Sequence, residues 1–260
     1  MTLKDRVALV TGAGSGIGEA IARRYAAEGA RVAALGRTAD ELEQVVRGIE
    51  KAGGTAAVVL ADVSDAKAME RAVREVEERW GRLDVVVANA GVNGVWAPIE
   101  ELEPEEFAST IAINLTGTFL TIKYAAPLLK QRGGSVVVVA SINGTRVFSN
   151  TGATAYSASK AGQVAMTKML ALELAKHRVR VNVICPGKIE TEIEENTEHR
   201  HLEKAKEPVE FPEGDIPLTD GKPGTSDQVA DLALFLASDA SSHVTGTEVW
   251  IDGGQSLMNG

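Results

Sequence analysis

The sequence is poor in cysteine and has no long hydrophobic run. Its 260 residues include one cysteine, Cys185, which excludes an intramolecular disulfide and is typical of a reducing compartment. A transmembrane helix needs ~18 or more consecutive apolar residues, and no segment approaches that length. The N-terminus enters an alternating apolar run without a charged and then apolar leader. These absences favour a cytoplasmic protein with no membrane partner.

Basic charge is also scarce. Lys and Arg number 27 against 36 Asp and Glu, which gives a net charge of −9. Because no basic stripe is available to neutralise phosphates, a nucleic-acid partner is not expected. His199 and His201 stand two positions apart without a third candidate ligand, so no metal site is expected either.

Short β-rich runs alternate with helical patterns through most of the chain. We expect strands at residues 6–11, 31–35, 55–60, 85–88, 135–140, 180–184 and 248–251. We expect helices at residues 19–27, 40–52, 65–80, 104–129, 156–176 and, after a capping box that begins at Thr225, up to residue 236. Strands separated by such helices form a parallel sheet covered on both faces. The sequence therefore predicts an α/β protein with a doubly wound parallel sheet, in a single domain that spans residues 1–260.

Residues 190–224 interrupt this alternation. The segment is rich in Glu and Lys, contains four prolines and lacks an apolar period, so we expect a flap over a ligand cleft. Sheets of this kind bind ligands at the carboxyl ends of their strands. The chain has unusual residues at those ends, namely Asp62, Val63, Asn89, Ala90, Gly91, Ser141, Pro186 and Gly187.

A glycine cluster follows the first predicted strand and leads into the first predicted helix. It contains Gly12, Ser15, Gly16, Ile17 and Gly18. Glycines let the backbone turn tightly and approach a pyrophosphate, while the N–H groups at the helix start attract the anion. A tight turn that only packs helix on strand is the alternative. The strand, turn and helix context favours a dinucleotide site.

Arg37 follows the second predicted strand, where a carboxylate that binds a ribose 2′-hydroxyl is expected. The planar guanidinium suits a 2′-phosphate instead. Asp40 and Glu41 come later and suit the dipole of the next helix. We therefore expect NADP(H) to be preferred and NAD(H) to be possible, the alternative being an arginine that stacks on adenine in either cofactor.

Tyr156 and Lys160 are four residues apart at the start of an Ala-rich helical segment, so both side chains lie on one helical face. A phenol has a reference pKa of ~10, too high for efficient acid–base catalysis near neutral pH. An ammonium group ~4 Å away is worth about 4 kcal/mol at an effective dielectric of 20 and lowers that pKa. The pair is thus a candidate proton-transfer unit, and a half-buried Tyr beside a solvated Lys is the alternative.

Taken together, these motifs resemble the short-chain dehydrogenase/reductase family over essentially the whole chain. The matching residues are Thr11, Gly12, Gly16, Gly18, Asn89, Ala90, Gly91, Asn114, Ser141, Tyr156, Lys160, Pro186, Gly187, Thr191, Asp252 and Gly253. The resemblance implies a seven-stranded Rossmann-type sheet, a homotetramer or homodimer, and hydride transfer between a nicotinamide cofactor and a carbonyl or alcohol.

The same resemblance implies roles for individual residues. Tyr156 is expected to be the general acid or base, Ser141 to bond the substrate oxygen, Lys160 to hold the ribose and lower the pKa of the tyrosine, and Asn114 to support a proton-relay water. The cofactor residues implied in this way are Ser15 and Ile17 at the phosphates, Asp62 and Val63 at the adenine, Asn89 at the ribose, and Ile189 and Thr191 at the carboxamide.

One spacing departs from the family pattern. Ser141 lies two residues farther from Tyr156 than is usual, so we interpret the segment between Asn143 and Thr154 as lengthened. Ser149 is closer in sequence but is expected too far along that loop. Lys188 and Arg146 are interpreted as solvated side chains, with a contact to an acidic substrate as the alternative.

The sequence thus predicts an NADP(H)-linked oxidoreductase for a small secondary alcohol or ketone. Carbonyl reductases, 3-oxoacyl-type reductases and sugar or polyol dehydrogenases remain open, and the acidic flap favours a free small molecule over an acyl carrier protein. The alternative is a non-catalytic nucleotide-binding regulator or scaffold with the same fold.

Overall fold

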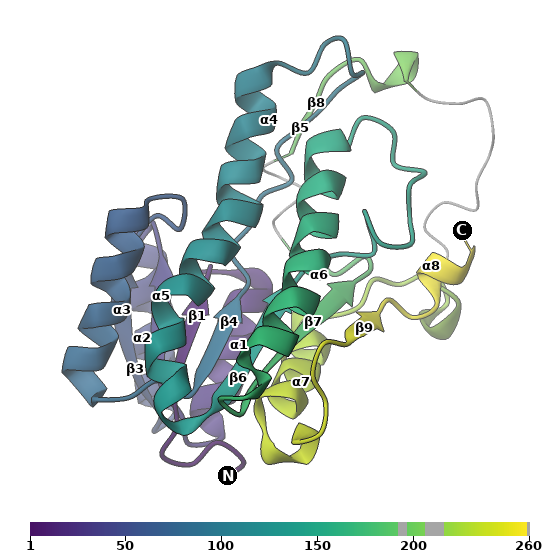
Figure 1. Ribbon diagram of the computed structural model, residues 1–260. Coiled ribbons are helices and arrows are strands. Elements are labelled where there is room, and N and C mark those ends of the chain that lie inside the picture. Colours follow the sequence, from purple (N-terminus) through teal and green to yellow (C-terminus); the bar gives the residue numbers. More distant parts are fainter. Residues whose placement is uncertain (192–196, 206–215, 259–260) are drawn as a thin grey trace.

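The computed structural model describes residues 1–191, 197–205 and 216–258 (Figure 1). Its centre is a seven-stranded parallel sheet in the order β3-β2-β1-β4-β6-β7-β9. The strands are β1 Val7–Thr11, β2 Arg31–Gly36, β3 Thr55–Leu60, β4 Val85–Ala88, β6 Gly134–Val139, β7 Val179–Pro186 and β9 Glu248–Ile251. The order changes direction at β1, which places a crevice at the carboxyl ends of β1 and β4.

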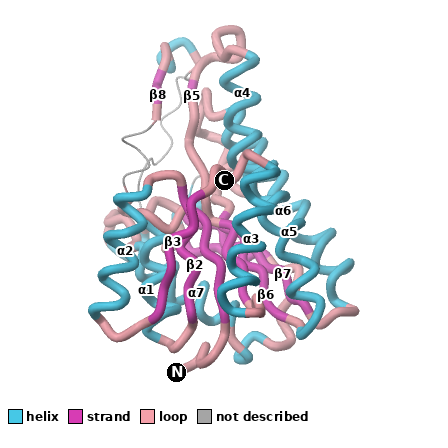
Figure 2. The backbone as a smooth tube through the Cα atoms, turned by 90° about the vertical axis from the view of Figure 1, so that its left-hand side faces the viewer, coloured by secondary structure: helices cyan, strands magenta, loops and turns pink. Residues whose placement is uncertain are grey.

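Helices cover both faces of the sheet (Figure 2). One layer contains α1 Gly16–Ala27, α2 Ala39–Lys51 and α7 Ser226–Ala237, and the other contains α3 Ala66–Trp80, α5 Gly117–Arg132 and α6 Thr154–Ala175. In β1, Val7 and Leu9 enter the core under the second layer, while Ala8 and Val10 enter the core under the first. Because both faces are buried, a central strand such as β1 is apolar along nearly its whole length.

The structure confirms the predicted fold class and sheet, with boundaries shifted by only a few residues. The predicted helix at residues 104–129 differs from the observed one. It is α4 Pro104–Ile111, then a π-helical turn Ala112–Thr116, then α5. The N–H of Gly117 bonds to the carbonyl of Ala112, five residues earlier. Apolar periodicity does not separate an α-helical from a π-helical turn, and π-turns often occur at functional sites.

Two short strands outside the main sheet were not predicted. Strand β5, Val95–Trp96, pairs in parallel with β8, Glu198–His199, above the carboxyl edge of the sheet and beside α4 (Figures 1 and 2). Strands of two residues are too short to show alternation. The short helix α8, Gln255–Met258, was also not predicted. Of the predicted flap at 190–224, residues 192–196 and 206–215 lie outside the described residues. Within the described part of the chain, no helix is long and apolar enough to cross a membrane.

Candidate active site

Two cavities lie at the carboxyl edge of the sheet, and both include Gly91 in their walls. The first has a volume of about 580 Å³ and lies between the ends of β4, β6 and β7. Predicted site residues on its walls are Ile17, Asn89, Gly91, Ser141, Tyr156, Lys160, Pro186, Gly187, Ile189 and Thr191. The second has a volume of about 170 Å³, and its walls include Gly12, Ser15, Arg37, Asp62, Val63, Ala90 and Gly91. The structure therefore brings together residues that the sequence places on separate strands.

The glycine-rich turn joins the two cavities to the start of α1. Gly12 has a φ of +65°, a left-handed conformation that favours glycine. A β-carbon on Gly18 would lie 1.9 Å from the carbonyl oxygen of Gly12, so Gly18 allows the helix to pack against the turn and lines neither cavity. Asn89 fixes the turn from β4 by donating to the carbonyl of Thr11 over 3.0 Å.

The start of α1 retains its capacity to bind an anion. Ser15 occupies the N-cap but makes no side-chain capping bond. Helix N-termini with open N–H groups bind phosphates. Ser15 faces the second cavity and Ile17 the first, so this terminus lies between the two. A dinucleotide pyrophosphate fits the donors that this turn presents.

The second cavity carries both signs of charge. Arg37 is largely exposed and its Nη1 lies 3.8 Å from Oδ2 of Asp62. A hydrogen bond from Ser64 is the main cause that lowers the pKa of Asp62, with a smaller contribution from Arg37. Glu41, which the sequence analysis assigned to the helix dipole alone, also lines this cavity. A β-carbon on Gly14 would lie 2.8 Å from its Oε2, so the Glu41 carboxylate lies against the glycine-rich turn.

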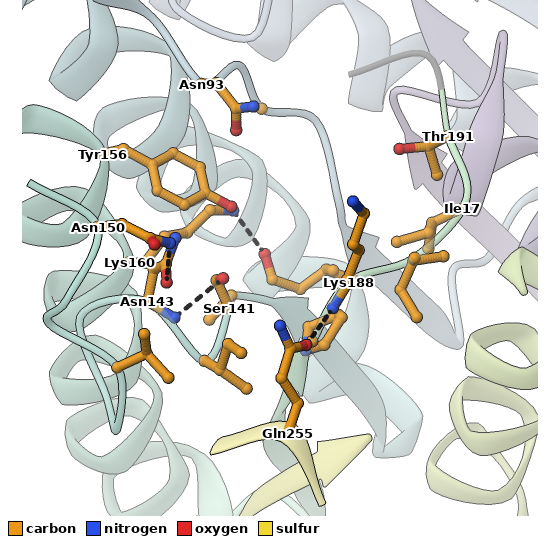
Figure 3. Close-up of a pocket in the computed structure, with 18 of the residues that line it drawn as sticks. Ile17, Asn93, Ser141, Asn143, Asn150, Tyr156, Lys160, Lys188, Thr191 and Gln255 are labelled. Carbon is orange, nitrogen blue, oxygen red and sulfur yellow. Dashed lines mark hydrogen bonds between the residues drawn. The ribbon is translucent and has the colours of Figure 1, made fainter. Parts of the chain in front are cut away.

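Tyr156 and Lys160 are both buried in the wall of the first cavity, one turn apart on α6. Nζ of Lys160 donates to the carbonyl of Val139 at the end of β6 over 3.0 Å, and it lies 5.4 Å from the ring centre of Tyr156 (Figure 3). Ser141, two residues beyond the end of β6, lies near the phenol of Tyr156 and acts to lower its pKa. These three side chains converge at one point of the cavity.

Burial affects the protonation of both groups of this pair. Burial raises the pKa of Tyr156, and the nearby Ser141 hydroxyl offsets part of that rise. Burial also lowers the pKa of Lys160 to about 8. Loss of solvation is the largest influence on both groups and acts against the predicted lowering of the tyrosine pKa by Lys160, which stays a prediction.

The lengthened loop after Ser141 is held close to α6. The N–H of Asn143 donates to Oγ of Ser141 over 3.1 Å, so the loop fixes the serine hydroxyl in place. Gly144 has a φ of +78°, and a β-carbon there would lie 2.2 Å from the carbonyl oxygen of Ser157. Glycine at this position lets two additional residues fit without moving Ser141 away from Tyr156. Ser149, which was expected too far along the loop, does reach the cavity wall.

Asn114 lies behind Gly91 rather than on a cavity wall. It is fully buried within the π-helical turn. Its amide donates to the carbonyl of Val92 and to Oγ of Ser159, and it accepts from the N–H of Val92 over 2.9 Å. A β-carbon on Gly91 would lie 3.2 Å from its Oδ1 and 3.5 Å from Nζ of Lys160. Asn114 thus connects the loop after β4 to the helix that carries Tyr156.

The first cavity is also lined by residues that the sequence did not indicate. They are Asn93, Trp96, Asn143, Asn150 and Gln255. Trp96 lies on β5, whose pairing with β8 joins residues about a hundred positions apart, so no local signal identifies it. Asn143 and Asn150 belong to the lengthened loop, and its unusual length was the sequence feature that could have indicated them.

Four residues for which no catalytic or binding role was expected from the sequence, Lys188, Arg146, Cys185 and His201, each have defined surroundings in the structure. Lys188 lines the first cavity, with its main-chain N–H bonded to Oε1 of Gln255. Arg146 stacks 3.6 Å from the ring centre of Trp250. Cys185 is buried, which raises the pKa of its thiol to about 12. His201 pairs with Glu101, and no cluster that could hold a metal ion occurs among the described residues.

Comparisons with known proteins agree with this geometry. Residues 12–256 match the family model described as enoyl-(acyl carrier protein) reductase. The chain is 40% identical to a 3-oxoacyl-[acyl-carrier-protein] reductase of Thermotoga maritima over 98% of this chain and 99% of the relative. It is also similar to the crystal structure of a 3-ketoacyl-ACP reductase from Sinorhizobium meliloti, with a TM-score of 0.92, 57% identity, and coverage of 96% of this chain and 99% of that one.

Two further crystal structures contain nicotinamide cofactors. A 3-ketoacyl-(acyl-carrier-protein) reductase from Brucella melitensis is complexed with NADH, at a TM-score of 0.85, 32% identity and coverage of 98% and 99%. A short chain dehydrogenase from Burkholderia cenocepacia is complexed with NADP, at a TM-score of 0.86, 33% identity and coverage of 98% and 99%.

Proposed function

The chain belongs to the short-chain dehydrogenase/reductase family and is an NAD(P)-dependent oxidoreductase, and we propose that it transfers a hydride between NADP(H) and a small secondary alcohol or ketone. The observation that carries this proposal is the convergence of Ser141, Tyr156 and Lys160 on one cavity that adjoins the glycine-rich turn through Gly91. We assign the catalytic roles to these three residues and to Asn114.

The cofactor fits along both cavities. We propose that the N-terminus of α1, with Ser15 and Ile17, holds the pyrophosphate, and that the second cavity holds the adenosine. The first cavity then receives the nicotinamide beside Ile189 and Thr191. When bound there, the cofactor supplies or accepts the hydride, and the protein supplies orientation and charge.

Tyr156 and Ser141 are placed to act on the substrate oxygen. When a hydride reaches a carbonyl carbon, negative charge develops on the oxygen, and donors preorganised at that atom stabilise it. Because burial raises the pKa of Tyr156, its phenol is protonated at neutral pH and suited to donate. The Oγ of Ser141 already accepts from Asn143, which leaves its O–H available as a donor.

Lys160 and Asn114 are proposed to support the proton transfer. With a pKa of about 8, Lys160 is mostly charged at neutral pH, and its position beside Gly91 suits contact with the cofactor ribose. Asn114 holds Val92 and the loop after β4 beside this ammonium group. In the proposed mechanism, Asn114 supports the relay that restores the proton of Tyr156.

We propose a preference for NADP(H) over NAD(H). The support is Arg37, whose exposed guanidinium lies on the wall of the second cavity and suits a 2′-phosphate. Glu41 acts in the opposite direction, since a carboxylate repels a phosphate and accepts from a ribose hydroxyl. We therefore infer a moderate rather than an absolute preference.

We further infer that the chain works as a single domain in a homo-oligomer, a tetramer or a dimer, in the cytoplasm. Exposed apolar side chains on neighbouring helices support the oligomer, namely Phe119 on α5 and Met169 and Leu172 on α6. The buried, unpaired Cys185 is consistent with a reducing compartment. The described part of the predicted flap, residues 190–191, 197–205 and 216–224, is proposed to cover the substrate.

A panel of ketones and secondary alcohols, assayed with both cofactors by the absorbance of the reduced nicotinamide, tests the proposal. We expect turnover of at least one pair, with kcat/KM higher for NADP(H). Cofactor binding without turnover of any substrate would instead identify a nucleotide-binding regulator. A matching titration of cofactor binding separates this result from a failure to bind at all.

A further inference from the structure

The first cavity is lined by five residues that the proposed mechanism does not use, namely Asn93, Trp96, Asn143, Asn150 and Gln255, and together we call them the amide wall. From this wall we infer that the substrate is a small polyhydroxylated molecule, a sugar alcohol or the corresponding hydroxyketone. The inference rests on the proposed function and specifies its substrate class.

Two amides of this wall orient each other. Nδ2 of Asn150 donates to Oδ1 of Asn143 over 3.1 Å (Figure 3). The other amide atoms of the pair, Nδ2 of Asn143 and Oδ1 of Asn150, have no hydrogen-bond partner among the described residues. Neither is a fully enclosed orphan atom of the described structure, so both are open to solvent or to a bound molecule. The pair therefore presents one donor and one acceptor next to Ser141.

Two more amides complete the wall and are each fixed by a single bond. Nδ2 of Asn93 donates to Oγ1 of Thr197 over 2.8 Å. Oε1 of Gln255 accepts from the main-chain N–H of Lys188 over 2.8 Å (Figure 3). In each case, the second amide atom has no bonding partner within the described part of the chain. An amide that is fixed by one hydrogen bond can form another through its second amide atom. Hydroxyl groups suit such amides, because each hydroxyl both donates and accepts.

Trp96 supplies an apolar surface between these polar groups. Its ring centre lies 6.4 Å from that of Tyr156 and 5.5 Å from that of His199. Its Nε1 donates to the carbonyl of Asn93 over 3.2 Å, which fixes the ring plane. An indole face packs well against the C–H groups of a carbon chain or ring whose hydroxyls point sideways.

Other substrate classes fit this wall less well. A long acyl chain needs a continuous apolar channel, and burying four amides against it without partners costs free energy at each. A cationic substrate needs a carboxylate, and none lines this cavity among the described residues. Neutral hydroxyl groups match the donors and acceptors that are present.

Matched substrates of one carbon skeleton test the inference. With the wild-type enzyme, kcat/KM is measured for 1,3,4-trihydroxybutan-2-one and butan-2-one, and for butane-1,2,3,4-tetrol and butan-2-ol, together with a 3-oxoacyl thioester of pantetheine. We expect each polyhydroxylated member to exceed its deoxy partner by at least ~10-fold, because a site that hydrogen-bonds a hydroxyl rejects an analogue that lacks it. A thioester or a deoxy compound as the best substrate would overturn the inference and leave the proposed function standing.

Asn150→Leu and Asn93→Leu separate binding from intrinsic reactivity, since hydroxyl groups also change the reactivity of a carbonyl. Each substitution should reduce the preference for the polyhydroxylated member by at least ~5-fold. Gln131→Leu, an exposed amide at the end of α5, is the matched control. An unchanged preference in both cavity variants, with unchanged melting temperatures, would overturn the inference.

Failure of the proposed function gives a different result. If no compound is turned over, calorimetry with the cofactor-saturated protein measures binding of the tetrol and of butan-2-ol. Tighter binding of the tetrol supports the amide wall as a polyol site, and equal or undetectable binding of both overturns it.

Discussion

The two cavities at the sheet edge control charge in different ways. In the first, Tyr156 and Lys160 are buried, and loss of solvation shifts the pKa of both groups. In the second, Arg37, Glu41 and Asp62 are at least partly exposed, and their effects are screened by water. We therefore expect substitutions in the first cavity to change the catalytic rate or the free energy of unfolding strongly. Substitutions in the second cavity should change only the preference between NADP(H) and NAD(H), and by a smaller factor.

The largest effect is expected for Tyr156→Phe. Removal of the phenolic hydroxyl removes the proton donor, and general acid–base catalysis contributes ~10²–10⁴-fold to a rate. We expect kcat to fall by that factor while NADPH affinity, measured by fluorescence titration, changes little. Tyr124→Phe on α5 is the control. Wild-type kcat in Tyr156→Phe would show that burial at this cavity serves packing and not chemistry.

Lys160→Met tests whether burial lowers the pKa of the lysine. Its pKa falls from 10.5 to about 8 on folding, so between these pH values the unfolded chain binds more protons than the folded one. The contribution of Lys160 to the free energy of unfolding should therefore rise with pH across this window, by up to about 3 kcal/mol. It is the difference between wild type and Lys160→Met, in which the opposite contribution of the buried Cys185 thiol cancels.

The measurement is denaturant unfolding of the cofactor-free protein at pH 7 and pH 10. The stability of wild type relative to Lys160→Met should rise from pH 7 to pH 10, and its stability relative to Lys130→Met, exposed near the end of α5, should not change. Equal pH dependence in wild type and Lys160→Met would show that the ammonium group is solvated, and the contrast between the cavities would be lost.

Arg37→Asp should act on cofactor choice alone. An exposed charge-assisted bond to a 2′-phosphate is worth about 1.5 kcal/mol, so kcat/KM for NADPH relative to NADH should fall ~10-fold. Arg74→Asp on α3 has the same charge change far from the cavity. A cofactor ratio that does not change would show that Arg37 does not contact the adenosine ribose.

The smallest effect is expected for Glu41→Gln. Loss of a carboxylate near the 2′-position should raise the NADPH to NADH ratio about 3-fold, since exposed charge pairs contribute ~0–1 kcal/mol. Glu43→Gln, two residues along α2 and paired with Arg47, is the control. A ratio that falls or stays constant would contradict the position of Glu41 beside the glycine-rich turn.

The sequence was sufficient to predict the sheet and the residues at its carboxyl edge. Buried parallel strands are continuous apolar runs. Because the carboxyl ends of parallel strands lie at the same edge of a sheet, the residue that follows each run lies at that edge. The π-helical turn was not predictable, because the same apolar period fits an α-helix. The orientation of Glu41 depends on how α2 packs against the glycine-rich turn, which is set by the core around Leu42.

The effect of burial on the pKa of Tyr156 was not predictable for a related reason. The helical spacing of Tyr156 and Lys160 gives their separation but not their burial, and burial decides the sign. The amide wall depends on contacts between distant segments, since the pairing of β5 with β8 brings Trp96 beside His199. Local patterns carry no information about such contacts.

The pairing of β5 with β8 has a consequence for how selectivity evolves in this enzyme. Arg200, which follows β8, adds two contacts to this pairing. Its main-chain N–H donates to the carbonyl of Trp96, and its guanidinium donates to the carboxylate of Glu106 on α4. The part of the amide wall on and before β5, Asn93 and Trp96, is therefore joined through Arg200 to α4. Exchange of residues 93–96 together with 197–204 would replace Asn93 and Trp96 as one unit and leave Ser141, Tyr156 and Lys160 in place.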